Sequence, residues 1–301
     1  MQRTNIFRGM GIALVTPFKS NGSIDWEALE NLAAAQINSG ADFLCVLGTT
    51  AETPCLSSEE KAEVMQRVKR VAAGRVPLLL GCGGNNTRAV CDYLRTADLT
   101  GFSGVLTVCP YYNKPSQEGL YRHFRAVADA SPLPIVLYNV PGRTGVNLEA
   151  DTTLRIAAAS KKVVAIKEAS GRVEQISHII RQAPDGFEVL SGDDGLTLDL
   201  MQRGGVGVIS VIGNAYPRGY SDMVHAAAEG DYATAKQINT ALQDMYKLMM
   251  VDGNPAGIKA LLSAQHRIND ELRRPLVPAR VETHDEINEA RRKLVGVVAD
   301  F

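Results

Sequence analysis

The sequence of 301 residues has no excess of charge of either sign and no long apolar run. Lys and Arg total 32 against 33 Asp and Glu, a formal net charge of −1, which argues against nucleic acid or an anionic membrane surface as a partner. No apolar run approaches the roughly 20 residues that span a bilayer, and residues 1–18 lack the apolar core of a signal peptide. We therefore expect a cytoplasmic protein with no nucleic-acid or membrane partner.

Signatures of metal and cofactor binding are also missing. The five cysteines form no CxxC pair, and the five histidines are scattered without ligand spacing. Cys45, Cys82 and Cys109 lie in apolar runs, where reduced, buried thiols are the simplest interpretation. No GxGxxG follows the first apolar run, so nothing favours a dinucleotide-binding fold. We expect neither a metal nor a cofactor.

Short apolar runs recur along the chain with longer amphipathic segments between them. They are apolar almost throughout rather than alternating, which is typical of parallel strands covered on both faces. Strands alternating with helices predict either a closed (β/α)₈ TIM barrel or an open doubly wound sheet, and the number of runs favours the barrel. The eight runs are 11–17, 42–50, 77–84, 104–112, 134–142, 163–171, 187–195 and 206–214.

The segments between the runs carry helix signals. Residues 57–73 and 116–130 each open on a serine that can cap a helix, followed by acidic residues in the first turn. The last ninety or so residues show helical patterns and no strand signal. The sequence thus predicts a catalytic barrel over residues 1–214 and a C-terminal helical region over residues 215–301.

In such a barrel the active site lies at the C-terminal ends of the strands. Taken singly, each residue there has a structural explanation: threonines as helix caps, tyrosines as gap fillers, paired aspartates as turn residues, and the lysine and arginine as solvated charges. Their coincidence at one end of a barrel is what indicates a site. The residues are Thr16, Gly48–Thr50, Glu52, Tyr111, Tyr112, Tyr138, Asn139, Arg143, Lys167, Glu168, Gly192–Asp194, Ile209 and Ser210.

Lys167 ends the apolar run "VVAIK" and suggests a specific chemistry. Burial disfavours a charged amine, and a neutral amine can attack a ketone to form a Schiff base. The iminium then withdraws electrons, so the neighbouring carbon loses a proton and becomes an enamine nucleophile. Tyrosine and threonine hydroxyls can relay that proton. Amides of the Gly-Thr-Thr turn can hold one carboxylate, and an arginine can hold a second.

Five motifs together resemble the dihydrodipicolinate synthases, members of the pyruvate-dependent class I aldolase superfamily that includes N-acetylneuraminate lyase. The resemblance runs from about Gly11 to the C-terminal helices, with the motifs in the family's order. It implies condensation of pyruvate with L-aspartate 4-semialdehyde on the diaminopimelate route to lysine. The motifs are "GTTAE" (48–52), "YYNKPSQEGLYRHF" (111–124), "YNVPGRTG" (138–145), "IKEASG" (166–171) and "SGDD" (191–194).

The resemblance also implies roles for individual residues. Lys167 would form the Schiff base, with Tyr138 as general acid and base, and Thr49 would link Tyr138 to Tyr112. In the family this second tyrosine reaches in from a neighbouring subunit, so a homodimer or homotetramer is expected. The substrate-binding residues would be Thr50 on the pyruvate carboxylate, Arg143 on the carboxylate of the aldehyde substrate, and Gly192 and Ile209 through their backbone carbonyls.

Two alternatives stay open. One is another pyruvate aldolase, such as a neuraminate or keto-deoxy sugar acid lyase. The sialic acid lyases resemble the same scaffold but lack an arginine equivalent to Arg143 and typically carry Ser-Thr in the first motif, so "GTT" and "YNVPGRTG" favour the synthase. The other is a catalytically silent barrel, which the complete residue set argues against.

The sequence departs from the family pattern at two places. Ala51 replaces the second glycine of the usual GTTGE motif, which would restrict the turn at a positive φ but which we expect the backbone to tolerate. In lysine-inhibited members of the family, the inhibition site uses a histidine after the GTTGE segment and a glutamate further along the chain. Here Ser58 and Lys61 lie where that histidine would be and Ala89 lies where the glutamate would be, whereas Asn85 and Tyr111 are present. Inhibition by L-lysine is predicted to be weak or absent.

Overall fold

The computed structural model describes residues 6–300. Eight strands of this part of the chain follow in sequence order around a closed parallel barrel. Seven of them lie within predicted runs, and the first begins at Gly9, two residues before the predicted run 11–17. The predicted (β/α)₈ barrel is therefore confirmed. The strands are β1 (Gly9–Ala13), β2 (Phe43–Val46), β3 (Leu78–Gly81), β4 (Gly104–Val108), β5 (Ile135–Asn139), β6 (Val163–Glu168), β7 (Glu188–Ser191) and β8 (Gly207–Ser210). The expectation that residues 1–18 form no signal peptide falls partly on residues 1–5, which lie outside the described residues.

The α-helices alternate with the strands and then continue alone. After β8 the chain forms α9 and a helical extension, α10–α12, as the absence of strand signals predicted. The helices are α1 (Trp26–Asn38), α2 (Ser58–Ala72), α3 (Thr87–Thr96), α4 (Gln117–Ala130), α5 (Pro141–Thr144), α6 (Ala150–Ala159), α7 (Val173–Gln182), α8 (Thr197–Gln202), α9 (Pro217–Ala228), α10 (Tyr232–Val251), α11 (Ala256–Ala264) and α12 (Val281–Leu294).

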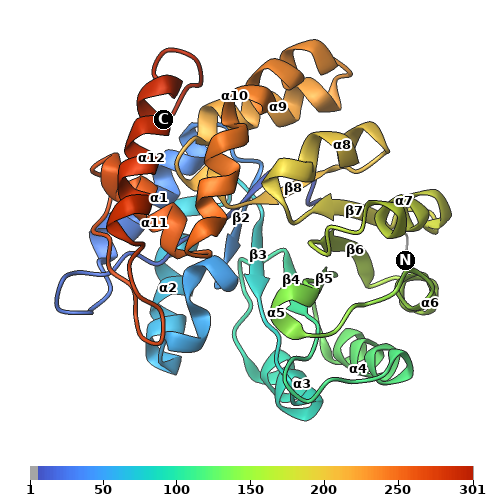
Figure 1. Ribbon diagram of the computed structural model, residues 1–301. Coiled ribbons are helices and arrows are strands. Elements are labelled where there is room, and N and C mark those ends of the chain that lie inside the picture. Colours follow the sequence, from blue (N-terminus) through green and yellow to red (C-terminus); the bar gives the residue numbers. More distant parts are fainter. Residues whose placement is uncertain (1–5, 301) are drawn as a thin grey trace. The chain divides into compact units, whose positions relative to one another are not determined.

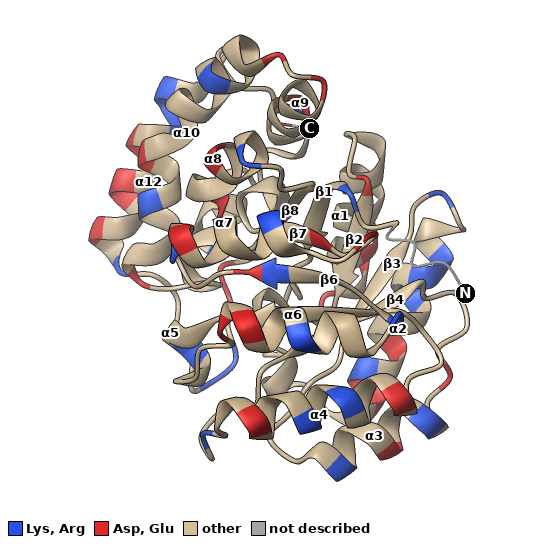
Figure 2. Cartoon of the chain, turned by 90° about the vertical axis from the view of Figure 1, so that its right-hand side faces the viewer, with Lys and Arg blue, Asp and Glu red and all other residues tan. Residues whose placement is uncertain are grey.

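Contacts group the chain into two compact units. One unit contains residues 6–8 and Pro77–Ile209, and therefore strands β3 to β7 and most of β8. In it the helices α3, α4, α6 and α7 lie along the outer side of the strands, each packed against the next (Figure 1). All residues of β5 and β6 are buried, as expected for strands covered on both faces. Lys, Arg, Asp and Glu are interspersed along α4 and α6 (Figure 2).

The other unit contains Gly9–Val76 and residues 210–300. Helix α9 packs against β1, and α10 packs against α9, α11 and α12. Helix α11 is apolar and buried from Ala256 to Leu262, with a single charged residue, Lys259, inside it. Among residues 6–300 no helix has the length and apolar character that crossing a membrane requires.

Two of the predicted helix starts are built as expected. Ser57 caps α2 and accepts from the amide of Glu60, whose carboxylate accepts in turn from the Ser57 amide, which completes a capping box. Ser116 caps α4 by accepting from the amide of Gly119, with no reciprocal bond. These caps fix where each helix leaves its loop, and so they help to place the residues that precede them.

Candidate active site

Lys167 and Tyr138 lie side by side at the ends of two neighbouring strands. Tyr138 of β5 is the register partner of Lys167 of β6. Lys167 is 5% exposed, and its Nζ lies 4.5 Å from the centroid of the Tyr138 ring. The lysine is thus a buried amine held against an aromatic ring and not a surface lysine beyond a core strand.

Gly192 lies close against the aliphatic part of Lys167. A Cβ at this position would come within 3.0 Å of Lys167 Cε and 2.7 Å of Ala169 Cβ, so a side chain here would displace the lysine. The Gly192 amide donates to the Glu168 carbonyl at 2.7 Å, which keeps the loop after β7 next to the end of β6. Ile209 lies on β8, whose Val208 pairs with Ser191. The structure therefore brings Gly192 next to the lysine and places Ile209 on the strand beyond.

Glu168 takes the opposite face of β6 and is buried in a polar network that sequence reasoning did not identify. Its carboxylate accepts from Asn139 Nδ2 at 2.6 Å, from Ser170 Oγ at 2.5 Å and from Gln175 Nε2 at 3.2 Å. Burial raises the pKa of Glu168, and these donors act against the rise. The network joins the ends of β5 and β6 directly behind Tyr138 and Lys167. Because side chains alternate between the two faces of a strand, the sequence could have predicted that Glu168 points away from the face that carries Lys167.

Arg143 is exposed on the short helix α5, directly after β5. Its amide donates to the Val140 carbonyl at 2.9 Å, so the chain turns into α5 directly after β5, the strand that carries Tyr138. A guanidinium can hold a carboxylate through two parallel hydrogen bonds, and this one lies at the surface just after the end of β5.

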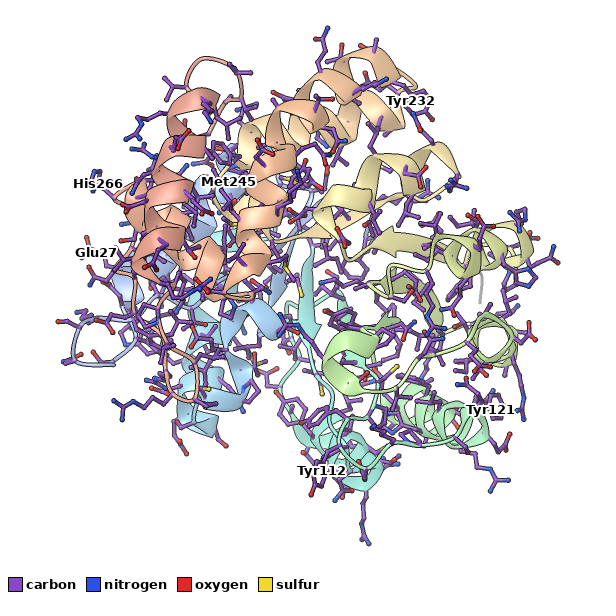
Figure 3. All side chains as sticks on the ribbon, viewed as in Figure 1. Glu27, Tyr112, Tyr121, Tyr232, Met245 and His266 are labelled. Atoms are coloured by element: carbon purple, nitrogen blue, oxygen red, sulfur yellow. The ribbon has the colours of Figure 1, made fainter. Side chains whose placement is uncertain are left out.

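Tyr112, labelled in Figure 3, is one of the most exposed large side chains of the described residues. It is 90% exposed and has a positive φ of 71°, which is uncommon for a bulky residue. Tyr111 beside it is 40% exposed. The structure therefore does not place Tyr112 against Tyr138, and the ring does not fill a gap in the core.

In the other unit, Thr49 and Thr50 lie in a tight turn after β2. The turn consists of two 3-10 helices, η1 (Thr49–Ala51) and η2 (Thr53–Cys55), with Gly48 as the cap of the first, so the threonines are not caps. Thr50 is 2% exposed, and its Oγ1 accepts from Asn254 Nδ2 at 3.0 Å.

Ala51 fits this turn without strain. It lies within η1, and the residue with a left-handed backbone is Glu52, with a φ of +54°. The Ala51 carbonyl accepts from Thr16 Oγ1 at 2.8 Å. The expectation that the backbone tolerates Ala51 is confirmed.

Asp193 is a turn residue, as predicted: it caps a 3-10 helix, η3 (Asp194–Leu196), by accepting from the Gly195 amide at 2.9 Å.

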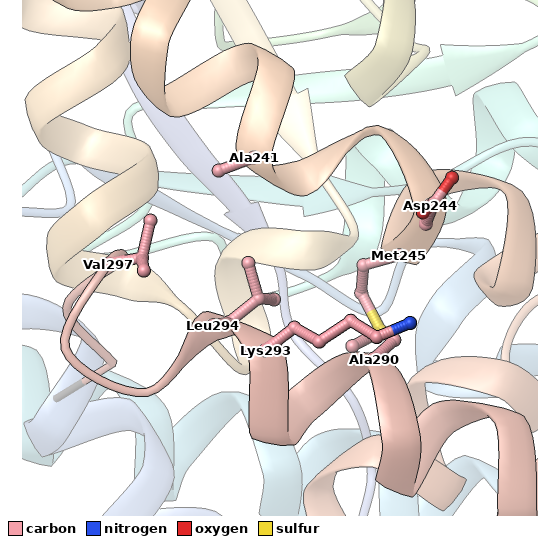
Figure 4. A pocket seen from close by; sticks show the side chains of 7 residues that line it. All are labelled: Ala241, Asp244, Met245, Ala290, Lys293, Leu294 and Val297. Carbon is pink, nitrogen blue, oxygen red and sulfur yellow. The ribbon is translucent and has the colours of Figure 1, made fainter.

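Neither a metal site nor the cavity of the structure involves the predicted residues. Within residues 6–300 no cluster of three His, Cys, Asp or Glu side chains could hold a metal ion. A cavity of about 280 Å³ in the helical extension includes none of the predicted site residues. It is lined by Ala241, Asp244, Met245, Ala290, Lys293, Leu294 and Val297 (Figure 4).

Comparison with known proteins gives a uniform result. The Dihydrodipicolinate synthetase family profile matches residues 6–293. The chain is 53% identical to the 4-hydroxy-tetrahydrodipicolinate synthase of Parabacteroides distasonis, over 95% of this chain and 97% of the relative. The crystal structure of the chloride-inhibited dihydrodipicolinate synthase of Acinetobacter baumannii, complexed with pyruvate, is similar with a TM-score of 0.93 and 36% identity, covering 98% of this chain and 100% of that one. The dihydrodipicolinate synthase of Cyanidioschyzon merolae with lysine bound has a TM-score of 0.92 at 36% identity and the same coverage.

Proposed function

Because the chain belongs to the dihydrodipicolinate synthetase family, we propose that it condenses pyruvate with L-aspartate 4-semialdehyde through a Schiff base on Lys167. The observation that carries this proposal is the buried Lys167 amine against the Tyr138 ring at the ends of β6 and β5. An amine in this position is shielded from water and has a hydroxyl-bearing ring beside it. The product, 4-hydroxy-tetrahydrodipicolinate, belongs to lysine biosynthesis through diaminopimelate.

The proposed condensation proceeds through covalent intermediates on Lys167. The Lys167 amine attacks the ketone carbon of pyruvate, and loss of water leaves an iminium. The iminium draws electrons from the adjacent methyl carbon, which gives up a proton and becomes an enamine. The enamine carbon attacks the aldehyde of the second substrate, and that substrate's own amine then displaces Lys167 and closes the ring. Tyr138 is the group that takes and returns protons next to the amine.

The remaining roles concern binding and proton supply. We assign Thr49 and Tyr112 to a proton relay with Tyr138, and Thr50 to the pyruvate carboxylate. Arg143, exposed on α5, would bind the carboxylate of the aldehyde substrate in a bidentate fork. Gly192 and Ile209 would contribute backbone carbonyls. No resident cofactor takes part in this scheme, and we place the enzyme in the cytoplasm with the other enzymes of amino-acid biosynthesis.

A coupled assay tests the substrate assignment. The protein is expected to turn over pyruvate with L-aspartate 4-semialdehyde and to leave neuraminate and keto-deoxy sugar acids unchanged. Preference for a sugar acid would identify a lyase of the same superfamily instead. No turnover of any of them, and no reducible adduct with pyruvate, would favour a catalytically silent barrel.

Tyr112 is predicted to act in a neighbouring subunit. Its 90% exposure and positive φ suit a side chain that is buried only when two copies of the chain meet. Tyr112→Phe keeps the ring but removes the hydroxyl, so we expect kcat to fall by about 10²-fold, the usual contribution of one proton-transfer group. The measurement is the initial rate of the variant with both substrates.

Subunit mixing shows where Tyr112 acts. Tyr112→Phe chains, with their reduced activity, and inactive Lys167→Ala chains are co-expressed with different tags and purified as mixed oligomers. A site with Lys167 from one chain and Tyr112 from the other is then complete, so activity returns well above the sum of the two homo-oligomers. Mixed oligomers with no recovered activity would show that Tyr112 serves its own subunit.

Inhibition by L-lysine is predicted to be weak or absent. Lys61, half-buried on α2, lies where lysine-inhibited members of the family have a histidine. Ala89, exposed on α3, lies where they have a glutamate. The ammonium groups of a bound lysine would lose an acidic partner and meet a like charge. Initial rates should therefore change little with millimolar L-lysine. Strong inhibition at sub-millimolar lysine would contradict the prediction, and Ala89→Glu is the variant that should strengthen inhibition.

A further inference from the structure

A fully buried ion pair ties the Thr49–Glu52 turn to the C-terminal helical region. Lys259 Nζ of α11 lies 2.5 Å from Glu52 Oε1, and both side chains are 0% exposed. The same ammonium donates to the Glu271 carbonyl at 2.8 Å and lies 4.2 Å from the centroid of the Phe18 ring. The other carboxylate oxygen, Glu52 Oε2, accepts from the Arg273 amide at 2.9 Å. Both oxygens of Glu52 are thus held by residues of one segment, 259–273.

Glu52 needs such an anchor because of its backbone. Its φ of +54° and ψ of +36° are left-handed, a conformation that glycine adopts freely and that costs other residues energy. It separates η1 from η2, so its conformation sets the direction in which Thr49 and Thr50 are presented. A non-glycine residue in this conformation persists when surrounding contacts hold it there, and the buried ion pair is that contact.

A second contact from the same region reaches Thr50 itself. Asn254, in the loop between α10 and α11, donates through Nδ2 to Thr50 Oγ1 at 3.0 Å. Since the hydroxyl oxygen accepts this hydrogen bond, its own proton is directed elsewhere and can be donated to an anion. The contact therefore orients the Thr50 hydroxyl as a donor.

We propose that Glu52, Lys259 and Asn254 are positioning residues that let the C-terminal helical region set the affinity of the Thr49–Thr50 turn for the pyruvate carboxylate. None of them has a reacting role. This inference rests on the proposed function, because it assumes that the turn binds pyruvate. It gives the helical region that follows the barrel a part in catalysis beyond stability.

The first test separates positioning from stability. Glu52→Gln with Lys259→Met removes both charges, keeps the side-chain lengths and leaves an acceptor for the Arg273 amide, so the double variant is expected to fold. Its KM for pyruvate should rise about three- to tenfold, as for the loss of one well-placed contact, while the KM for L-aspartate 4-semialdehyde changes less than about twofold. A folded double variant with an unchanged KM for pyruvate would overturn the proposal.

Asp42→Ala is the matched control. Asp42 precedes β2 in the same unit and accepts from the Met10 amide at 2.7 Å and from His225 Nε2 at 2.8 Å, so its loss destabilises that unit at the opposite end of the strand from the turn. It should lower the melting temperature and leave the KM for pyruvate unchanged. An equal rise in KM for the control would show that any destabilisation has this effect, which also overturns the proposal.

The second test uses Asn254 and needs no change to the ion pair. Asn254→Ala should raise the KM for pyruvate about three- to tenfold through the Thr50 hydroxyl. In a Thr50→Val background, where that hydroxyl is gone, Asn254→Ala should have no further effect, whereas full additivity would contradict the orienting role. Activity of the wild type is the reference for both tests. A wild type without synthase activity refutes the proposed function, and an active wild type whose variants keep its KM refutes only this inference.

Discussion

Lys167→Ala is expected to fold and to lose nearly all synthase activity, by about 10⁴-fold or more in kcat, because no other group can form the covalent intermediate. The buried side chain is removed from a strand whose backbone pairing with β5 and β7 does not depend on it. The measurements are the coupled synthase assay and the far-ultraviolet circular dichroism of the purified variant.

Lys161→Ala is the natural control for this variant. Lys161 is exposed just before β6, so its removal should leave both the rate and the fold unchanged. If Lys167→Ala kept full activity and formed a pyruvate adduct on another lysine, such as the buried Lys259, the assignment of the Schiff base would be wrong.

Glu52→Gln, as a single substitution, should cause the largest loss of stability among the variants considered, about 3–5 kcal/mol in the free energy of unfolding. The cost does not come from the lost attraction alone. Removing the carboxylate leaves the Lys259 ammonium buried without its counter-charge, 0% exposed within α11. Urea unfolding of the variant against the wild type measures it. Adding Lys259→Met should recover most of the loss, since the uncompensated charge then disappears.

The pH dependence of this loss has a definite sign. Burial lowers the pKa of Lys259, and the charge of Glu52 opposes that shift. Without Glu52 the folded-state pKa falls further below its unfolded value, so the folded protein binds fewer protons than the unfolded chain between the two values. The penalty is then complete at low pH and shrinks as pH rises towards the unfolded pKa. A Glu52→Gln destabilisation that grows with pH would contradict the uncompensated-charge explanation.

The parts of this enzyme that were predictable from sequence are those with a local signal. Continuous apolar runs identified all eight strands, because strands covered on both faces leave no room for polar alternation. Ser57 and Ser116 marked helix starts, because capping involves residues only three positions apart. Lys167 was identifiable because a cation directly after a buried strand is uncommon and motifs from the other strands accompanied it.

The parts that were missed depend on contacts between distant residues. Glu52 and Lys259 are far apart in the chain, and neither sequence neighbourhood indicates that the two are buried together. Asn254 lies in a loop without a motif, and its proposed role rests on the contact with Thr50, 204 positions away in the chain. Glu168 is satisfied by donors from β5, from its own loop and from α7, a set that assembles only when the strands pair. Pattern and spacing along a sequence do not report such pairings.

A borohydride trap tests most directly whether Lys167 forms the Schiff base with pyruvate. The protein is incubated with pyruvate, reduced with sodium borohydride and analysed by intact mass spectrometry and peptide mapping. We expect one adduct per chain, with the mass of a reduced pyruvate Schiff base, on the peptide that contains Lys167, and none in Lys167→Ala. An unmodified protein, or an adduct mapped to another lysine, would contradict it.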